Sequence, residues 1–146
     1  MDNTFICSYS RTPIGSFQGN LKNIHTTKLG ANTISATLKK INFDASNIDE
    51  VIMGNVLSAG LGQAPARQAA IYAGLPYSVE CMTINKVCGS GLKAVMLADQ
   101  SIKTGNSNFV IAGGMENMSM APYYIKNGRN GLKFGDSKLI DSILFD

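Results

Sequence analysis

Apolar residues in this chain form short runs that alternate with longer stretches of helical spacing. Four runs rich in strand-forming residues lie at 4–10, 51–57, 81–85 and 108–112. Stretches with helical spacing lie at about 26–41, 65–73 and 89–104. Alternation of this kind predicts an α/β fold in which right-handed crossovers join a largely parallel sheet.

Proline and glycine set the limits of two of these helices. Pro65 is placed as the first residue of the second helix, and Gly74 closes it. The third helix, 89–104, is followed by Gly105 and is apolar on almost every side, with Leu92 and Val95 among its residues. We therefore expect this third helix to be buried in the interior of the protein.

The character of the chain changes after residue 117. Residues 118–136 contain several glycines and two adjacent tyrosines without a clear period, which predicts a loop. A short amphipathic piece, 137–146, follows, and the chain ends inside its helical pattern. We therefore expect a core of residues 1–117, followed by an insertion, 118–146, that is truncated.

Composition and charge exclude several classes of function. The chain has 146 residues, 45% of them hydrophobic, and a net charge of +3. Because its basic residues are scattered, no phosphate-tracking stripe for nucleic acid exists. No apolar run has the length of a membrane span, and the first residues lack the pattern of a secretory signal. With sparse cysteines, these features predict a cytoplasmic protein.

Cys88 is the strongest candidate for chemistry. It lies where a predicted strand ends and a helix begins, and a helix amino terminus stabilises a thiolate. Gly89 and Gly91 remove side chains near the sulfur, so that a planar thioester can approach the backbone. The N–H of Cys88 could face the oxyanion of an attacked thioester. Acyl exchange between thioesters is nearly balanced in energy, which suits a cysteine nucleophile.

A second interpretation of the same turn is dinucleotide binding. Residues 89–94 (GSGLKA) match the G-x-G-x-x-G/A fingerprint between a strand and a helix. That fingerprint requires an acidic residue at the end of the next strand. Here the strand ends in Ala112-Gly113-Gly114, and the nearest acid is Glu116. The fingerprint is therefore incomplete.

Other polar residues are weaker candidates. His25 is the only histidine, and a helix-cap or surface role is the simpler interpretation than catalysis. Gln63 and Arg67 could line a cleft or make structural hydrogen bonds, and Glu116 could orient the active-site loop or be a satisfied buried polar group. We interpret the two remaining cysteines as packing residues within strands; these are Cys7 and Cys81. With one histidine and no CxxC pair, no metal site is expected.

Several separate motifs resemble the thiolase family. Residues 84–95 (INKVCGSGLKAV) are similar to the acyl-enzyme segment of thiolases, Asn-x-x-Cys-x-Ser-Gly. Further stretches follow in the order of the family: 11–15 (RTPIG), 62–70 (GQAPARQAA) and 113–119 (GGMENMS), in which Asn117 replaces the usual serine. The resemblance covers essentially the whole chain. It leaves no role for dinucleotide binding at the Cys88 turn.

The resemblance implies a fold and a reaction. The fold would be the N-terminal half of a layered αβαβα arrangement, with a mostly parallel or mixed sheet and a buried catalytic helix. Cys88 would carry an acyl group during acetyl-CoA C-acetyltransferase chemistry, or the reverse 3-ketoacyl-CoA thiolysis. Coenzyme A thioesters would be substrates, with no permanently bound cofactor. Residues 118–146 would begin the insertion that covers coenzyme A, and the full-length protein would be a homodimer or homotetramer.

The resemblance also implies what this chain lacks. The activating histidine and the second cysteine of the family belong to a carboxy-terminal half, so we expect residues 1–146 alone to have little or no turnover. One alternative is a catalytically inactive, truncated thiolase-like chain that acts only as a dimerising fragment. A decarboxylating ketoacyl synthase, which also uses a cysteine nucleophile, fits the stretches at 62–70 and 113–119 less well.

Overall fold

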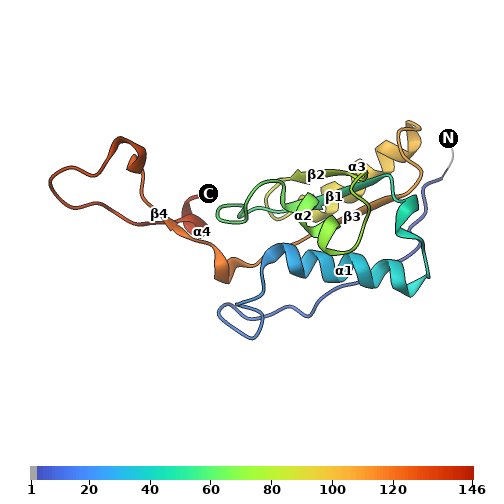
Figure 1. Cartoon of the computed structure of the whole chain (residues 1–146), viewed down its shortest axis with the longest axis horizontal. Coiled ribbons are helices and arrows are strands. Elements are labelled where there is room, and N and C mark those ends of the chain that lie inside the picture. The colour runs from blue at the N-terminus through green and yellow to red at the C-terminus, as the bar shows by residue number, and fades with distance from the viewer. Residues whose placement is uncertain (1–2) are drawn as a thin grey trace.

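The centre of the fold is a parallel three-stranded sheet (Figure 1). The computed structural model describes residues 3–146. Strand β1 (Glu50–Gly54) lies between β2 (Glu80–Ile84) and β3 (Val110–Gly114). The register places the last residue of β1 opposite the last residues of both neighbours. All three strands therefore end at one edge of the sheet, where the chain continues from β2 to Cys88.

Helices cover both faces of this sheet (Figure 1). Helix α2 (Pro65–Tyr72) packs on one face with α1 (Thr26–Lys40) beyond it, and α3 (Ser90–Lys103) packs on the other. Side chains alternate along β1 as the pleat requires, so that Val51 and Met53 join the α1–α2 side and Ile52 joins the α3 side. The predicted α/β fold with a parallel sheet is confirmed.

Helix α3 is buried on one face only. Ala94 and Ala98 pack on the sheet, whereas the apolar side chains on its other faces are exposed: Leu92, Val95 and Met96. The helix is therefore not buried on all sides among residues 3–146, in contrast to the expectation from its apolar sequence.

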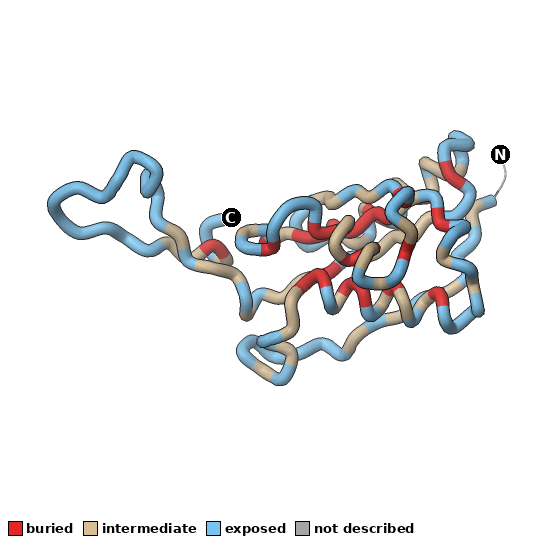
Figure 2. Tube along the Cα trace, viewed as in Figure 1, coloured by how far each residue is buried: buried red, intermediate tan, exposed pale blue. Residues whose placement is uncertain are grey.

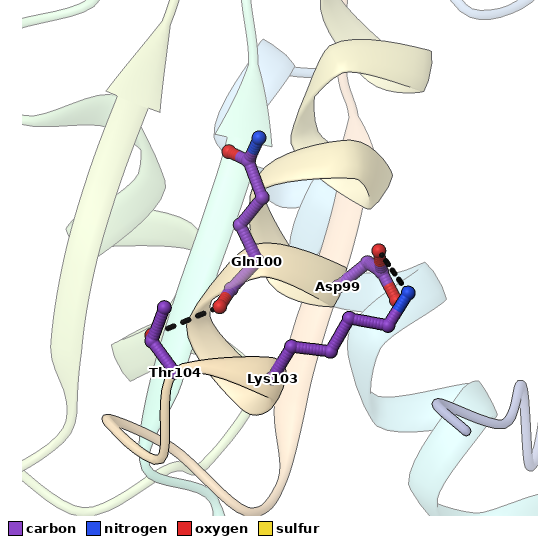
Figure 3. Close-up of polar contacts among 4 residues, drawn as sticks. All are labelled: Asp99, Gln100, Lys103 and Thr104. Atoms are coloured by element: carbon purple, nitrogen blue, oxygen red, sulfur yellow. Dashed lines mark hydrogen bonds and ion pairs between the residues drawn. The ribbon is translucent and has the colours of Figure 1, made fainter. Parts of the chain in front are cut away.

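Polar contacts hold the carboxy-terminal end of α3 (Figure 3). The Nζ of Lys103 lies 3.0 Å from the Oδ2 of Asp99, and the Thr104 hydroxyl donates to the carbonyl of Gln100 at 2.9 Å. Asp99 and Lys103 are about two-fifths exposed, so water screens their ion pair. These contacts lie in the last turn of the helix, at the end opposite to Cys88.

The predicted strand at 4–10 is wrong. Residues 4–10 run extended without ladder partners, and the side chains of Phe5, Ile6 and Tyr9 are exposed. The Ser8 hydroxyl holds the segment to α1 by donating to the carbonyl of Thr37 at 3.0 Å. Strand-forming side chains make a strand only beside a partner backbone, and none of the described strands lies next to this segment.

Several strand limits also differ from the sequence-based prediction, and two of the differences have a local reason. The N–H of Asn55, the residue after β1, still donates to the Ile84 carbonyl at 3.0 Å, but β1 ends at Gly54 because the N–H groups of the next two residues donate to a side chain, as described below. Strand β3 begins at Val110 because the N–H groups of Asn108 and Phe109 donate to the carboxylate of Asp49 at 2.7 and 3.0 Å. Those two residues are thereby held in a turn and not in the ladder.

Residues 118–146 form a loop that projects from the core (Figures 1 and 2). A short antiparallel pair at its base joins β4 (Tyr123–Tyr124) to β5 (Ile140–Asp141). The terminal helix α4 (Ser142–Phe145) is shorter than the sequence predicts. Residues 125–139 are exposed throughout. A loop is thus confirmed, while its treatment as an insertion separate from 1–117 stays a prediction.

Short one-turn 3-10 helices complete the chain at Ala45–Asn47, Met118–Met120 and Gly128–Asn130. None of the helices described for residues 3–146 combines the length and the apolar character needed to cross a membrane.

Candidate active site

Cys88 lies on an exposed turn between β2 and α3. Helix α3 begins two residues later, at Ser90, with Gly89 as its N-cap. The amino-terminal end of a helix carries partial positive charge, which favours a negative charge on a neighbouring group. The strand-to-helix turn predicted for Cys88 is therefore present, and its thiol is open to solvent.

The backbone of this turn is strained immediately before the cysteine. Val87 has φ +48°, in the left-handed region that β-branched residues rarely adopt. Three hydrogen bonds between backbone and side-chain groups hold the conformation. The N–H of Val87 donates to the Oδ1 of Asn85 at 2.8 Å, the N–H of Lys86 donates to the Ser90 hydroxyl at 2.8 Å, and that hydroxyl donates to the Val87 carbonyl at 2.6 Å.

Glycines allow the first turn of α3 to rest directly on the sheet. A β-carbon on Gly54, the last residue of β1, would lie 2.7 Å from the Ser90 carbonyl carbon and 2.8 Å from the Gly91 nitrogen. A β-carbon on Gly114, the last residue of β3, would lie 3.4 Å from the Gly91 Cα. Larger residues at the end of β1 would push the cysteine-bearing turn away from the sheet.

Glu116 binds the loop that follows β1. Its carboxylate accepts hydrogen bonds from the Asn55 amide at 2.8 Å and from the N–H groups of Val56 and Leu57 at 2.8 and 3.4 Å. The carbonyl of Val56 in turn accepts a long hydrogen bond, 3.5 Å, from the amide of Asn85. The structure thus brings Glu116 to a loop that contacts the Cys88 turn.

Asn55 is a site residue that sequence reasoning missed. It is buried, and its amide also donates to the Met115 carbonyl at 3.1 Å. Its Oδ1 is buried without a hydrogen-bond partner among the described residues. The available signal was a polar residue placed directly after a buried strand, at the edge where functional side chains gather in parallel sheets.

The other polar candidates have structural roles. His25 caps α1, where its Nδ1 lies 2.8 Å from the Thr27 hydroxyl. Arg67 donates to the carbonyls of Val79 at 2.7 Å and Tyr77 at 2.6 Å, which fixes the turn before β2. Gln63 is exposed, and its carbonyl accepts from Gln68. None of the hydrogen bonds described for residues 3–146 joins these residues to Cys88.

The remaining cysteines differ from one another. Cys81 is half-buried in β2, as expected for a packing residue, and burial raises the pKa of its thiol against the opposing effect of the Arg67 guanidinium. The expectation for Cys7 is wrong: it is exposed, because residues 4–10 do not enter the sheet. Among residues 3–146, His, Cys, Asp and Glu side chains form no cluster of three or more that could hold a metal.

Comparison with known proteins identifies the family. Residues 4–146 match the family model described as the thiolase N-terminal domain. The chain belongs to the thiolase family. Acetyl-CoA acetyltransferase 2 of Arabidopsis thaliana is 54% identical over 141 residues, and acetyl-CoA acetyltransferase of Pseudomonas aeruginosa is 52% identical over 146 residues. These matches cover 97% and 100% of this chain.

The chain spans only 35% and 37% of the lengths of these thiolase relatives. A solved structure shows the same fold: the crystal structure of Acat5 thiolase from Ascaris suum in complex with coenzyme A, with a TM-score of 0.88 and 43% identity. That match covers 93% of this chain and 35% of the Ascaris chain. The thiolase family and fold inferred from the sequence motifs are therefore confirmed.

Proposed function

We propose that this chain is the amino-terminal segment of an acetyl-CoA C-acetyltransferase in which Cys88 carries the acyl group. The observation that supports this role most directly is the exposed Cys88 thiol, two residues before α3 and next to the strained backbone of Val87. The relatives are named acetyl-CoA acetyltransferases, and the Ascaris thiolase was solved in complex with coenzyme A.

The proposed reaction has two steps. The Cys88 thiolate attacks the carbonyl carbon of acetyl-CoA, the thioester bond to coenzyme A breaks, and coenzyme A leaves as a thiol after taking up a proton. A second acetyl-CoA then loses a proton from its methyl carbon, which attacks the acetyl group on Cys88. The new carbon–carbon bond gives acetoacetyl-CoA and releases the cysteine. The reverse sequence is thiolysis of a 3-ketoacyl-CoA.

The base for these proton transfers would come from outside residues 1–146. The single histidine of the chain caps α1, and its Nδ1 is engaged by Thr27. We therefore infer that residues 1–146 alone turn over little substrate. We further propose that acyl-CoA is the only ligand required, with no permanent cofactor. We also propose that residues 118–146 begin the coenzyme A-covering insertion after a core of residues 1–117. The full-length protein would be a cytoplasmic homodimer or homotetramer.

Mass spectrometry of the protein after exposure to acetyl-CoA tests the site. We expect one acetyl group, mapped to Cys88, which is lost in Cys88→Ser and kept in the matched variants Cys7→Ser and Cys81→Ser. Acetylation of Cys7 or Cys81 without acetylation of Cys88 would refute the assignment. If the complete native protein formed no acetyl adduct and only dimerised, the alternative of a catalytically inactive, dimerising chain would be supported.

A further inference from the structure

The left-handed backbone at Val87 needs an explanation. A β-branched residue at φ +48° is a conformation that persists only where surrounding contacts enforce it, and such positions cluster at functional sites. Glycine would adopt the same backbone without strain, yet this turn has valine. The contacts that hold Val87 therefore determine the geometry of the residue that follows it.

Ser90 supplies the most direct of these contacts. Its hydroxyl accepts a hydrogen bond from the N–H of Lys86 at 2.8 Å and donates one to the carbonyl of Val87 at 2.6 Å, so that it bridges the two residues before Cys88. Ser90 is 4% exposed, and water therefore does not compete effectively for these bonds. Within this turn, the Asn85 side chain bonds only to the N–H of Val87.

The position of the Ser90 hydroxyl is itself fixed by packing. Its β-carbon lies against the backbone of Gly54 at the end of β1. The sheet therefore fixes the position of the Ser90 hydroxyl oxygen, and the hydrogen bonds of this oxygen fix the backbone of the turn. Loss of the oxygen alone, as in Ser90→Ala, would leave this packing in place and remove both of its hydrogen bonds. Val87 would then keep only the backbone bond from the Ser90 N–H to its carbonyl, at 3.1 Å, and the bond from its own N–H to Asn85.

We propose that Ser90 is a positioning residue for Cys88: its hydroxyl holds Val87 in the left-handed conformation, and this conformation directs the thiol into solvent at the start of α3. The proposal rests on the proposed function in taking Cys88 as the nucleophile. Ser90 itself need not touch the substrate. A change of φ at Val87 to a negative value would rotate the Cys88 side chain relative to the helix.

Iodoacetamide alkylation tests this role without acetyl-CoA. The rate at Cys88 is measured by peptide mapping in the full-length native protein, with exposed Cys7 as the internal standard and half-buried Cys81 as the reporter of unfolding. We expect Ser90→Ala to lower the ratio of the Cys88 rate to the Cys7 rate on the order of tenfold, because a thiol that turns away from solvent is less accessible to the reagent.

A second variant separates positioning from general stability. In the double variant Val87→Gly/Ser90→Ala, glycine adopts the left-handed backbone without strain and no longer needs the Ser90 hydroxyl. We therefore expect the ratio of the Cys88 rate to the Cys7 rate to rise above that of Ser90→Ala and to equal that of Val87→Gly alone. Ser142→Ala is the matched control, because Ser142 is also buried and its hydroxyl donates to the Pro122 carbonyl in the projecting loop. Its ratio should equal that of the native protein.

Three results would overturn the proposal: an unchanged ratio in Ser90→Ala, no recovery in the double variant, or a rise in Cys81 labelling in Ser90→Ala that shows loosening of the whole fold. The proposed function fails separately. If Cys88 reacts with iodoacetamide in a Ser90-dependent manner but is never acetylated by acetyl-CoA, the positioning role stands and the acyl-carrier role falls.

Discussion

A β-carbon added to Gly54 would lie 2.6 Å from the β-carbon of Ser90. Distances below 3.0 Å are essentially never seen for real β-carbons, so the end of β1 and the first turn of α3 are in direct backbone-to-side-chain contact. The strand and the cysteine-bearing turn are distant in sequence, and no spacer separates them. The sheet therefore sets the position of the turn.

Gly54→Ala should destabilise the protein and move the cysteine turn. Because both neighbouring groups are held by other contacts, the added methyl group overpacks the interior, at a cost of about 1–3 kcal/mol in the free energy of unfolding. Denaturant unfolding measures the loss. Gly128→Ala is the matched control, because a β-carbon added to Gly128 would have no heavy atom within 4 Å and its φ is ordinary. Equal unfolding midpoints for the two variants would contradict the expectation.

Glu116→Gln should loosen the loop after β1. The carboxylate accepts from the Asn55 amide and from the N–H of Val56, whereas the glutamine NH₂ group would face one of these donors. One donor would lose its partner, at a cost of about 1–3 kcal/mol. Amide hydrogen exchange of residues 55–57 should become faster. Glu80→Gln, at an exposed position of β2, serves as the control; comparable exchange in both variants would count against the role of Glu116.

Asn117→Ser should release the segment before α1. The Asn117 amide donates to the carbonyls of Ile24, Leu21 and Lys22 at 2.7, 3.0 and 3.3 Å, and its Oδ1 accepts from the N–H of Ser119 at 3.1 Å. A serine hydroxyl could still accept from the N–H of Ser119, but serine is too short to reach the three carbonyls. We expect a loss of about 1 kcal/mol in the free energy of unfolding.

The readout for Asn117→Ser is amide hydrogen exchange over residues 16–24, which should be faster than in the native protein. Asn20→Ser is the matched control, since Asn20 is exposed within the same segment. Protection that is equally retained in both variants would show that other contacts hold the segment, such as the bond from the N–H of Gln18 to the Ser119 hydroxyl at 2.8 Å.

Features that depend on neighbouring residues in sequence were predicted well. Pro65 begins α2, and Gly74 and Gly105 follow helices with φ of +92° and +77°, because each residue type acts through its own backbone preferences. Cys88 was placed correctly on a strand-to-helix turn for the same reason. Local chemistry is enough where one residue determines one turn.

Features that depend on distant partners were not predictable. The segment 4–10 has the composition of a strand but finds no partner strand within the described chain. The role of Asn55 arises from its contact with Glu116, and the packing of Ser90 arises from its contact with Gly54; both partners are separated from these residues by tens of positions in the sequence. The thiolase resemblance supplied the family and the fold, but it did not identify these contacts.

Asp49→Asn should make the stability of the folded protein less dependent on pH in the acidic range. The N–H groups of Phe109 and Asn108 donate to the Asp49 carboxylate and hold the pKa of this carboxyl below its ordinary value. A lowered pKa in the folded state contributes stability above the unfolded pKa of about 3.9, and this contribution is lost as pH falls through the folded pKa. The thermal midpoint of the variant should therefore lie below that of the native protein at pH 7, and the gap should narrow as the pH is lowered below about 4. Asp136→Asn, in the exposed part of the projecting loop, should show no such convergence. A gap that stays constant with pH would mean that the amide oxygen of asparagine serves as well as the carboxylate, and that the charge of Asp49 does not stabilise the junction between β1 and β3.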